Sequence, residues 1–181
     1  MQSNHLSEFT VFFDIDGVLG DFDRHLDRHA LRGADGNPRW NAVTQQWWQT
    51  MPHMQGAQDF FMRVAAKLHT RFLTAPTLST DCFTGKAAWV QTFLPHEGKG
   101  ALKRLIIAPS SDKAYLAGPT RILIDDREKN IKEWVAAGGI GIHFTGDFAA
   151  VERALQAAVP GLTLDITPAD VRAAINRRFG R

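Results

Sequence analysis

Short apolar segments alternate with helix-like segments along this chain. The apolar segments predict β-strands because they are brief, rich in β-branched and aromatic residues, and bounded by turn residues. They occupy residues 9–13, 71–74, 104–108, 121–124 and 141–144.

Three of the intervening segments predict helices, at residues 86–93, 128–137 and 147–158. The second of these ends at Gly138 and Gly139, and glycine commonly follows the last turn of a helix. Strands that alternate with helices are typical of βαβ units. The predicted fold class is therefore α/β, with a mainly parallel sheet.

One long interval, residues 20–55, contains no clear strand. It is too long for a plain loop in a compact domain, and it carries Trp40, Trp47 and Trp48 among polar residues. We expect a small helical cap, inserted after the first strand and lying over its carboxyl end. Residues 1–19 and 56–181 would then form the α/β core.

The composition is that of a globular protein with one core. The chain has 181 residues, of which 44% are hydrophobic and 22% charged. Its single cysteine, Cys82, excludes a disulfide framework and a thiolate metal cluster. Residues 1–8 are polar and do not have the pattern of a signal peptide. We expect a cytoplasmic location and no membrane partner.

The charge is weakly positive, with a formal net charge of +2 and a pI near 8.9. A nucleic-acid-binding face is usually more densely basic. The clearest basic cluster lies at the end of the chain, at Arg172, Arg177, Arg178 and Arg181. This balance suits a small anionic substrate better than a nucleic-acid strand.

The first predicted strand delivers Asp14 and Asp16 at its carboxyl end, directly before Gly17. Parallel α/β sheets bind their ligands at this edge. A divalent cation and a phosphoryl group would explain two carboxylates there, because hard cations prefer oxygen ligands and a carboxylate can act as a nucleophile. The alternatives are a turn cap and a calcium loop, and Gly17 comes too early for the latter.

Polar residues also follow the next three predicted strands. Thr74 ends the second, Lys113 lies just past the third, and Asp125 and Asp126 end the fourth. Each has an ordinary alternative as a strand-end threonine, a solvated lysine or a helix-capping pair. In this order, however, the four motifs resemble those of the haloacid dehalogenase (HAD) superfamily.

The resemblance spans residues 9–144 and implies a Rossmann-like core. Four segments are similar to the 5'(3')-deoxyribonucleotidase family, in which an arginine and often an asparagine follow the acidic pair, as Arg127 and Asn130 do here. The sequences of these segments are DIDGVLGDF at 14–22, KAAWV at 86–90, DK at 112–113 and IDDREKN at 124–130. The insertion differs from that of the better-known members in length and in amino-acid sequence.

The resemblance implies a role for each motif. Asp14 would attack phosphorus and form an aspartyl phosphate, while Asp16 would protonate the leaving oxygen and then activate water. Thr74 would donate to one phosphoryl oxygen. Lys113 would neutralise another, with Lys86 as the alternative lysine. Mg²⁺ is the expected cofactor, and its expected ligands are the Asp14 carboxylate, the backbone carbonyl of Asp16 and Asp126, with Asp125 behind them.

The expected substrate is a small phosphate ester, and the resemblance favours nucleoside monophosphates, in particular deoxyribonucleotides. The residues expected to contact it are Phe22, Trp47, Trp48, Ala75 and Lys86. Packing within the insertion is the alternative role for its aromatic residues. The functional alternatives are a phosphatase for another small ester or a nucleic-acid end, and a non-catalytic phosphate-binding module. An oligomer is compatible with the sequence.

Overall fold

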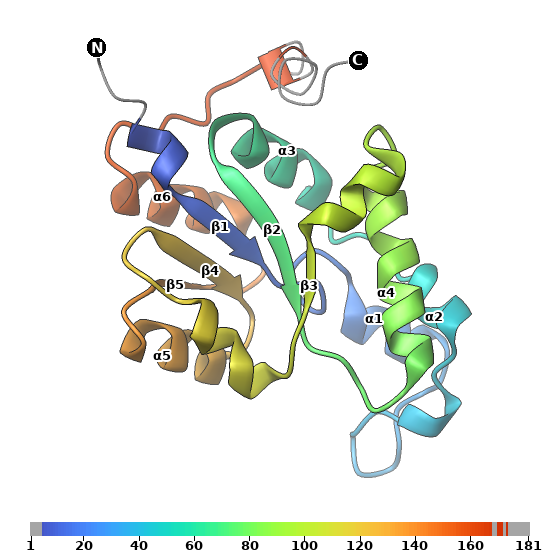
Figure 1. The fold of residues 1–181 in the computed structure, drawn as a ribbon. Coiled ribbons are helices and arrows are strands. Elements are labelled where there is room, and N and C mark those ends of the chain that lie inside the picture. Colours follow the sequence, from blue (N-terminus) through green and yellow to red (C-terminus); the bar gives the residue numbers. More distant parts are fainter. Residues whose placement is uncertain (1–4, 168–169, 172, 174–181) are drawn as a thin grey trace.

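The computed structural model describes residues 5–167, 170, 171 and 173. Five strands form one fully parallel sheet in the order β3-β2-β1-β4-β5 (Figure 1). The strands are β1 (Thr10–Phe13), β2 (His69–Thr74), β3 (Leu105–Ile107), β4 (Arg121–Asp125) and β5 (Ile140–His143). The α/β class and the parallel sheet predicted from the sequence are confirmed.

Helices cover both faces of this sheet. Successive side chains of the central strand point to opposite faces, so each face has apolar residues for the helices to pack against. Val11 and Phe13 enter the larger apolar cluster, which includes residues of α3 (Ala57–Lys67), α4 (Thr80–Phe93) and α6 (Phe148–Ala158). Phe12 packs on the other side against Trp134 of α5 (Glu128–Ala136), with a ring-centroid distance of 5.3 Å.

Some predicted boundaries were wrong. The third strand is shorter than predicted, because Arg104 ends the 3-10 helix η3 (Gly98–Arg104) instead of beginning the strand. Helix α4 begins at Thr80, capped by Ser79, so Lys86 lies in its middle. Helix α3 is not among the predicted elements, although its buried residues show a helical period: Ala57, Phe60, Phe61, Val64 and Ala65.

The insertion after β1 contains α1 (Phe22–Arg28), the 3-10 helix η2 (Trp40–Ala42) and α2 (Gln45–Gln49). It lies beyond the arrowhead of β1 in Figure 1, as the sequence predicts. Its apolar residues form a separate cluster with Cys82 of α4. The division into core (1–19 and 56–181) and cap (20–55) remains a prediction, and its last residues lie outside the described part of the chain.

The parallel topology places the carboxyl ends of all five strands at one edge. The chain turns from β1 toward β2 and β3 on one side, then continues with β4 and β5 on the other. Such a switch point opens a crevice beyond the strand ends. No helix within the described residues is long and apolar enough to cross a membrane.

Candidate functional site

A cavity of about 1000 Å³ lies at the carboxyl edge of the sheet, between the strand ends and the insertion. Acidic side chains from the strand ends and aromatic side chains from the insertion both line it. The strand ends contribute Asp14, Asp16 and Asp126, and the insertion contributes Phe22, Trp40, Trp48 and one further carboxylate, Asp23.

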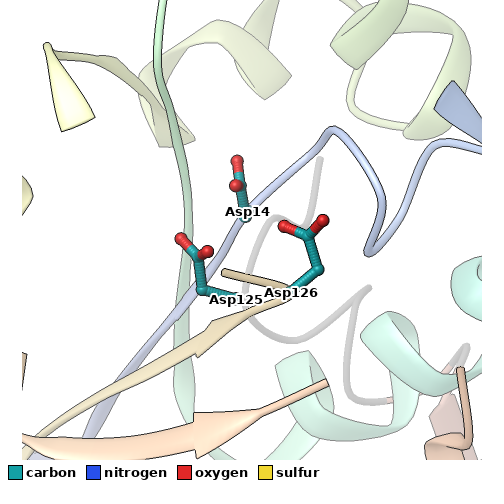
Figure 2. A group of neighbouring side chains, drawn as sticks. All are labelled: Asp14, Asp125 and Asp126. Carbon is teal, nitrogen blue, oxygen red and sulfur yellow. The ribbon is translucent and has the colours of Figure 1, made fainter. Parts of the chain in front are cut away.

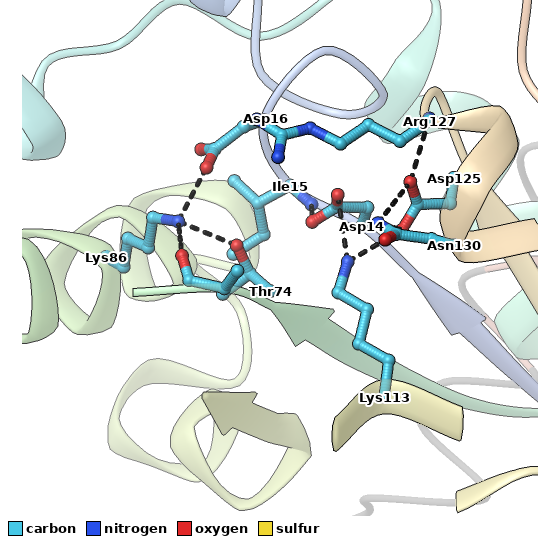
Figure 3. Close-up of polar contacts among 10 residues, drawn as sticks. Asp14, Ile15, Asp16, Thr74, Lys86, Lys113, Asp125, Arg127 and Asn130 are labelled. Carbon is cyan, nitrogen blue, oxygen red and sulfur yellow. Dashed lines mark hydrogen bonds and ion pairs between the residues drawn. The ribbon is translucent and has the colours of Figure 1, made fainter. Parts of the chain in front are cut away.

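Lys113 joins two of the strand ends (Figure 3). Its Nζ lies 3.0 Å from the Asp14 carboxylate and 2.7 Å from that of Asp125. An ammonium group has three hydrogens to donate. One therefore has no acceptor among the described residues. Lys113 is 1% exposed and does not itself line the cavity within the described part of the chain.

The Asp125 carboxylate is fully engaged by neighbouring donors. Its Oδ1 accepts from the backbone N–H of Arg127 and from Nδ2 of Asn130, each at 2.9 Å. Its Oδ2 accepts from Lys113 and, at 3.0 Å, from Asn130. These bonds orient Asp125 toward Lys113. The sequence motif contains Asn130, but sequence reasoning assigned it no role.

Three carboxylates lie close together at the carboxyl ends of β1 and β4 in Figure 2. One oxygen from each of Asp14, Asp125 and Asp126 lies within 4.8 Å of the others. Oδ1 of Asp126 is buried and has no hydrogen-bond partner within the described part of the chain. Oxygen donors at this density suit a hard divalent cation.

The backbone of Gly17 lies very close to the Asp126 carboxylate. A Cβ atom added to Gly17 would lie 2.5 Å from Oδ2 of Asp126, and Gly17 has a φ of +76°. Only glycine combines that backbone conformation with so close an approach. The loop after β1 is therefore shaped around the Asp126 carboxylate.

The electrostatics of the carboxylates reflect their crowding. Burial, and then the charges of Asp14 and Asp125, raise the pKa of Asp126 to about 7. Burial and Asp14 also raise the pKa of Asp125, although Lys113 opposes them. Burial disfavours the charge of Lys113, but the carboxylates of Asp14 and Asp125 raise its pKa above the ordinary value. A divalent cation would relieve the repulsion among the acids.

Lys86 organises the other side of the site. It is fully buried, and its Nζ donates to Oδ2 of Asp16 at 2.6 Å, Oγ1 of Thr74 at 2.7 Å and the Ala75 carbonyl at 2.6 Å. These three bonds use all its hydrogens. Burial raises the pKa of Asp16 despite this cation. Oδ1 of Asp16 is buried without a hydrogen-bond partner in the described residues.

The residues expected to contact substrate divide into two groups. Phe22, Trp48 and Ala75 line the cavity. Trp47 is 4% exposed and packs against His25; among the described residues, neither it nor Lys86 belongs to the lining. Trp40, which sequence reasoning left out of the site, lines the cavity and is 42% exposed. Its place in a tryptophan-rich insertion is the one sequence signal that could have identified it.

The comparisons with known proteins are limited to structure. No protein-family model matches the sequence, and no curated protein matches it. Two similar solved structures are of the HAD domain of effector protein Lem4 from Legionella pneumophila. That of an inactive mutant has a TM-score of 0.46 and 12% identity, covering 94% of this chain and 100% of that one. The other has a TM-score of 0.41 and 14% identity, covering 86% and 100%. Similarity at this level does not establish a family or an activity.

Proposed function

We propose that the protein is a Mg²⁺-dependent phosphomonoesterase that works through an aspartyl phosphate on Asp14. The observation that carries the proposal is the surroundings of Asp14 on the cavity floor. Lys113 lies 3.0 Å from its carboxylate on one side, and on the other side an Asp126 oxygen is within 4.8 Å. A carboxylate nucleophile beside a cation and a metal site is suited to phosphoryl transfer.

The two aspartates of the first strand end would divide the chemistry. An oxygen of Asp14 attacks phosphorus, and the bond from phosphorus to the leaving oxygen breaks. Asp16 gives its proton to that oxygen and then takes a proton from the water that hydrolyses the aspartyl phosphate. The unpartnered Oδ1 of Asp16 and the raised pKa of this residue support its role.

The remaining polar groups would hold the phosphoryl group. Lys113 has a hydrogen to donate to a phosphoryl oxygen, whereas the hydrogens of Lys86 are all in use. This difference supports Lys113 as the phosphate-binding lysine. Thr74 accepts from Lys86 through Oγ1, which leaves the Thr74 hydroxyl hydrogen for an acceptor.

Asp14, Asp126 and the backbone carbonyl of Asp16 would hold Mg²⁺, with Asp125 behind them. Asp125 already accepts hydrogen bonds at both oxygens, while Oδ1 of Asp126 accepts none from the described residues. When bound, Mg²⁺ would reduce the repulsion between the carboxylate and the phosphate.

We further propose nucleoside monophosphates, in particular 5'(3')-deoxyribonucleotides, as substrates. The aromatic residues Phe22, Trp40 and Trp48 line the same cavity as Asp14. Stacking of a base on an aromatic side chain contributes roughly 1 to 3 kcal/mol. Trp40 is the most exposed of the three and offers the most accessible ring.

The test is phosphate release from a panel of 5'- and 3'-nucleotides, deoxynucleotides and sugar phosphates, with Mg²⁺ and with EDTA. Asp14→Asn is the inactive control, and Asp165→Asn, at an exposed position, is the matched control. Mg²⁺-dependent turnover that Asp14→Asn abolishes would support the proposal. Nucleotide binding by both wild type and Asp14→Asn, without turnover by the wild type, would indicate a binding module instead.

A further inference from the structure

Trp48 lies over the buried ammonium of Lys86. The Lys86 Nζ is 4.8 Å from the centroid of the Trp48 ring, and Trp48 is itself only 1% exposed. A cation over the face of an indole is attracted by the negative potential of the ring. The indole therefore both attracts the ammonium and shields it from water.

This contact completes the surroundings of Lys86. Its three hydrogens are donated to Asp16, Thr74 and Ala75, and the indole faces the same ammonium. An ammonium held in this way has little freedom to change its position. The carboxylate of Asp16, which is 25% exposed at its side chain, therefore has a fixed partner.

The seating of helix α2 on helix α4 fixes the indole. A Cβ atom added to Gly85 would lie 2.4 Å from Cβ of Trp48 and 2.7 Å from the carbonyl oxygen of Gln45. The backbone N–H of Gln45 donates to Asp81 of α4 at 3.1 Å. Gly85 directly precedes Lys86 in the chain. The same close approach therefore places Trp48 against Lys86.

We propose that Trp48 is a positioning residue, whose indole face holds the Lys86 ammonium and thereby orients Asp16 for proton transfer to the leaving oxygen. This inference rests on the proposed phosphatase function. It gives the insertion a part in the chemistry, because a residue of α2 controls a group bonded to the first strand end.

Two aryl esters of similar shape separate this role from substrate stacking. Phenyl phosphate releases a strongly basic phenolate that needs a proton, whereas 4-nitrophenyl phosphate releases a stable phenolate that needs one much less. Loss of correct Asp16 geometry should therefore affect the first ester more than the second. The comparison uses kcat/KM, because hydrolysis of the aspartyl phosphate is common to both esters and can limit kcat. We expect Trp48→Leu to lower kcat/KM about tenfold more on phenyl phosphate than on 4-nitrophenyl phosphate.

Two further variants complete the experiment. Trp48→Phe keeps an aromatic face and should restore most of the kcat/KM on phenyl phosphate. Trp134→Leu is the matched control, because Trp134 is a fully buried tryptophan that packs against Phe12 on the other face of the sheet. It should leave the ratio of the two kcat/KM values unchanged. Thermal denaturation checks that each variant is folded, and Trp48→Met replaces Trp48→Leu if the latter does not fold.

Three results would overturn the inference while the phosphatase function stands: equal loss of kcat/KM on both esters, Trp48→Phe as impaired as Trp48→Leu, or the same change of ratio in Trp134→Leu. If the wild type hydrolyses neither these esters nor the nucleotide and sugar phosphate panel, the proposed function fails first and the inference fails with it.

Discussion

Lys86 and Asp16 form a 2.6 Å ion pair between positions 70 residues apart in the chain. The pair joins the middle of α4 to the loop after β1. Because Lys86 also bonds Thr74 at the end of β2, it connects three parts of the site. Although Lys86 does not line the cavity, we therefore expect its substitution to lower activity strongly.

Replacement of Lys86 by methionine should lower kcat by about a hundredfold or more, since it removes the charge that orients the general acid. Lys86→Arg should not rescue activity, because a planar guanidinium does not fit a fully enclosed ammonium site. The measurement is steady-state phosphate release at saturating Mg²⁺. Lys129→Met, at an exposed position, is the control. A kcat for Lys86→Met within threefold of wild type would contradict this role.

The sequence predicts the site residues at the strand ends better than it predicts the contacts of the two lysines. Asp14, Thr74 and Asp125 directly follow or end apolar strands, so parallel pairing alone brings them to one edge. The roles of the two lysines depend on distances that no local pattern encodes. The predicted helix begins at Lys86, whereas α4 begins at Thr80, so Lys86 lies in the middle of the helix, where it is buried.

The local sequence also does not predict which tryptophans of the insertion face the cavity. Trp47 and Trp48 are adjacent on α2, and adjacent helical residues point in different directions. Which of them faces the cavity depends on how α2 sits on α4. That packing needs Gly85, because a side chain there would collide with Trp48.

The raised pKa of Asp126 predicts a pH dependence of Mg²⁺ binding. The folded protein holds a proton on Asp126 up to about pH 7, whereas the ordinary value is 3.8. The contribution of this group to stability is therefore present below pH 3.8 and is lost as the pH rises through 7. Mg²⁺ must displace that proton at low pH. We expect Mg²⁺ to raise Tm more at pH 8 than at pH 6.

Thermal denaturation at both pH values, with Mg²⁺ and with EDTA, measures this effect. In Asp126→Asn the rise of Tm with Mg²⁺ should be abolished or strongly reduced at both pH values. An equal rise at pH 6 and pH 8 in the wild type would show that protonation of Asp126 does not compete with the metal.

Arg104 should be a major contributor to stability away from the site. Its side chain is 9% exposed, and its Nε donates to both oxygens of Glu97, whose side chain is 6% exposed. Nη1 also donates to Oγ1 of Thr70 at 2.7 Å. Loss of one partner leaves a buried charge uncompensated, so Arg104→Met should lower the free energy of unfolding by about 3 to 5 kcal/mol.

Urea denaturation measures this loss, with Arg153→Met as the control. Arg153 is 71% exposed and lies 3.8 Å from Asp147, so its substitution should cost at most about 1 kcal/mol. Equal effects of the two substitutions would mean that burial does not strengthen the Arg104 interactions.

Gly17→Ala should damage the proposed metal site specifically. The new Cβ would lie 2.5 Å from Oδ2 of Asp126, and this carboxylate would have to move. Displacement of a metal ligand commonly weakens metal binding by about 10- to 100-fold. We expect a corresponding increase in the Mg²⁺ concentration that gives half-maximal kcat and half-maximal rise of Tm.

Gly161→Ala separates this effect from backbone strain. Gly161 has a φ of +75°, against +76° at Gly17, and no atom lies within 4 Å of its added Cβ. A left-handed conformation destabilises an alanine by about 1 to 2 kcal/mol, so both substitutions should lower Tm in EDTA. Only Gly17→Ala should change the Mg²⁺ requirement, because only its methyl group meets Asp126. If both variants keep the wild-type requirement, the contact between Gly17 and Asp126 does not shape a metal site.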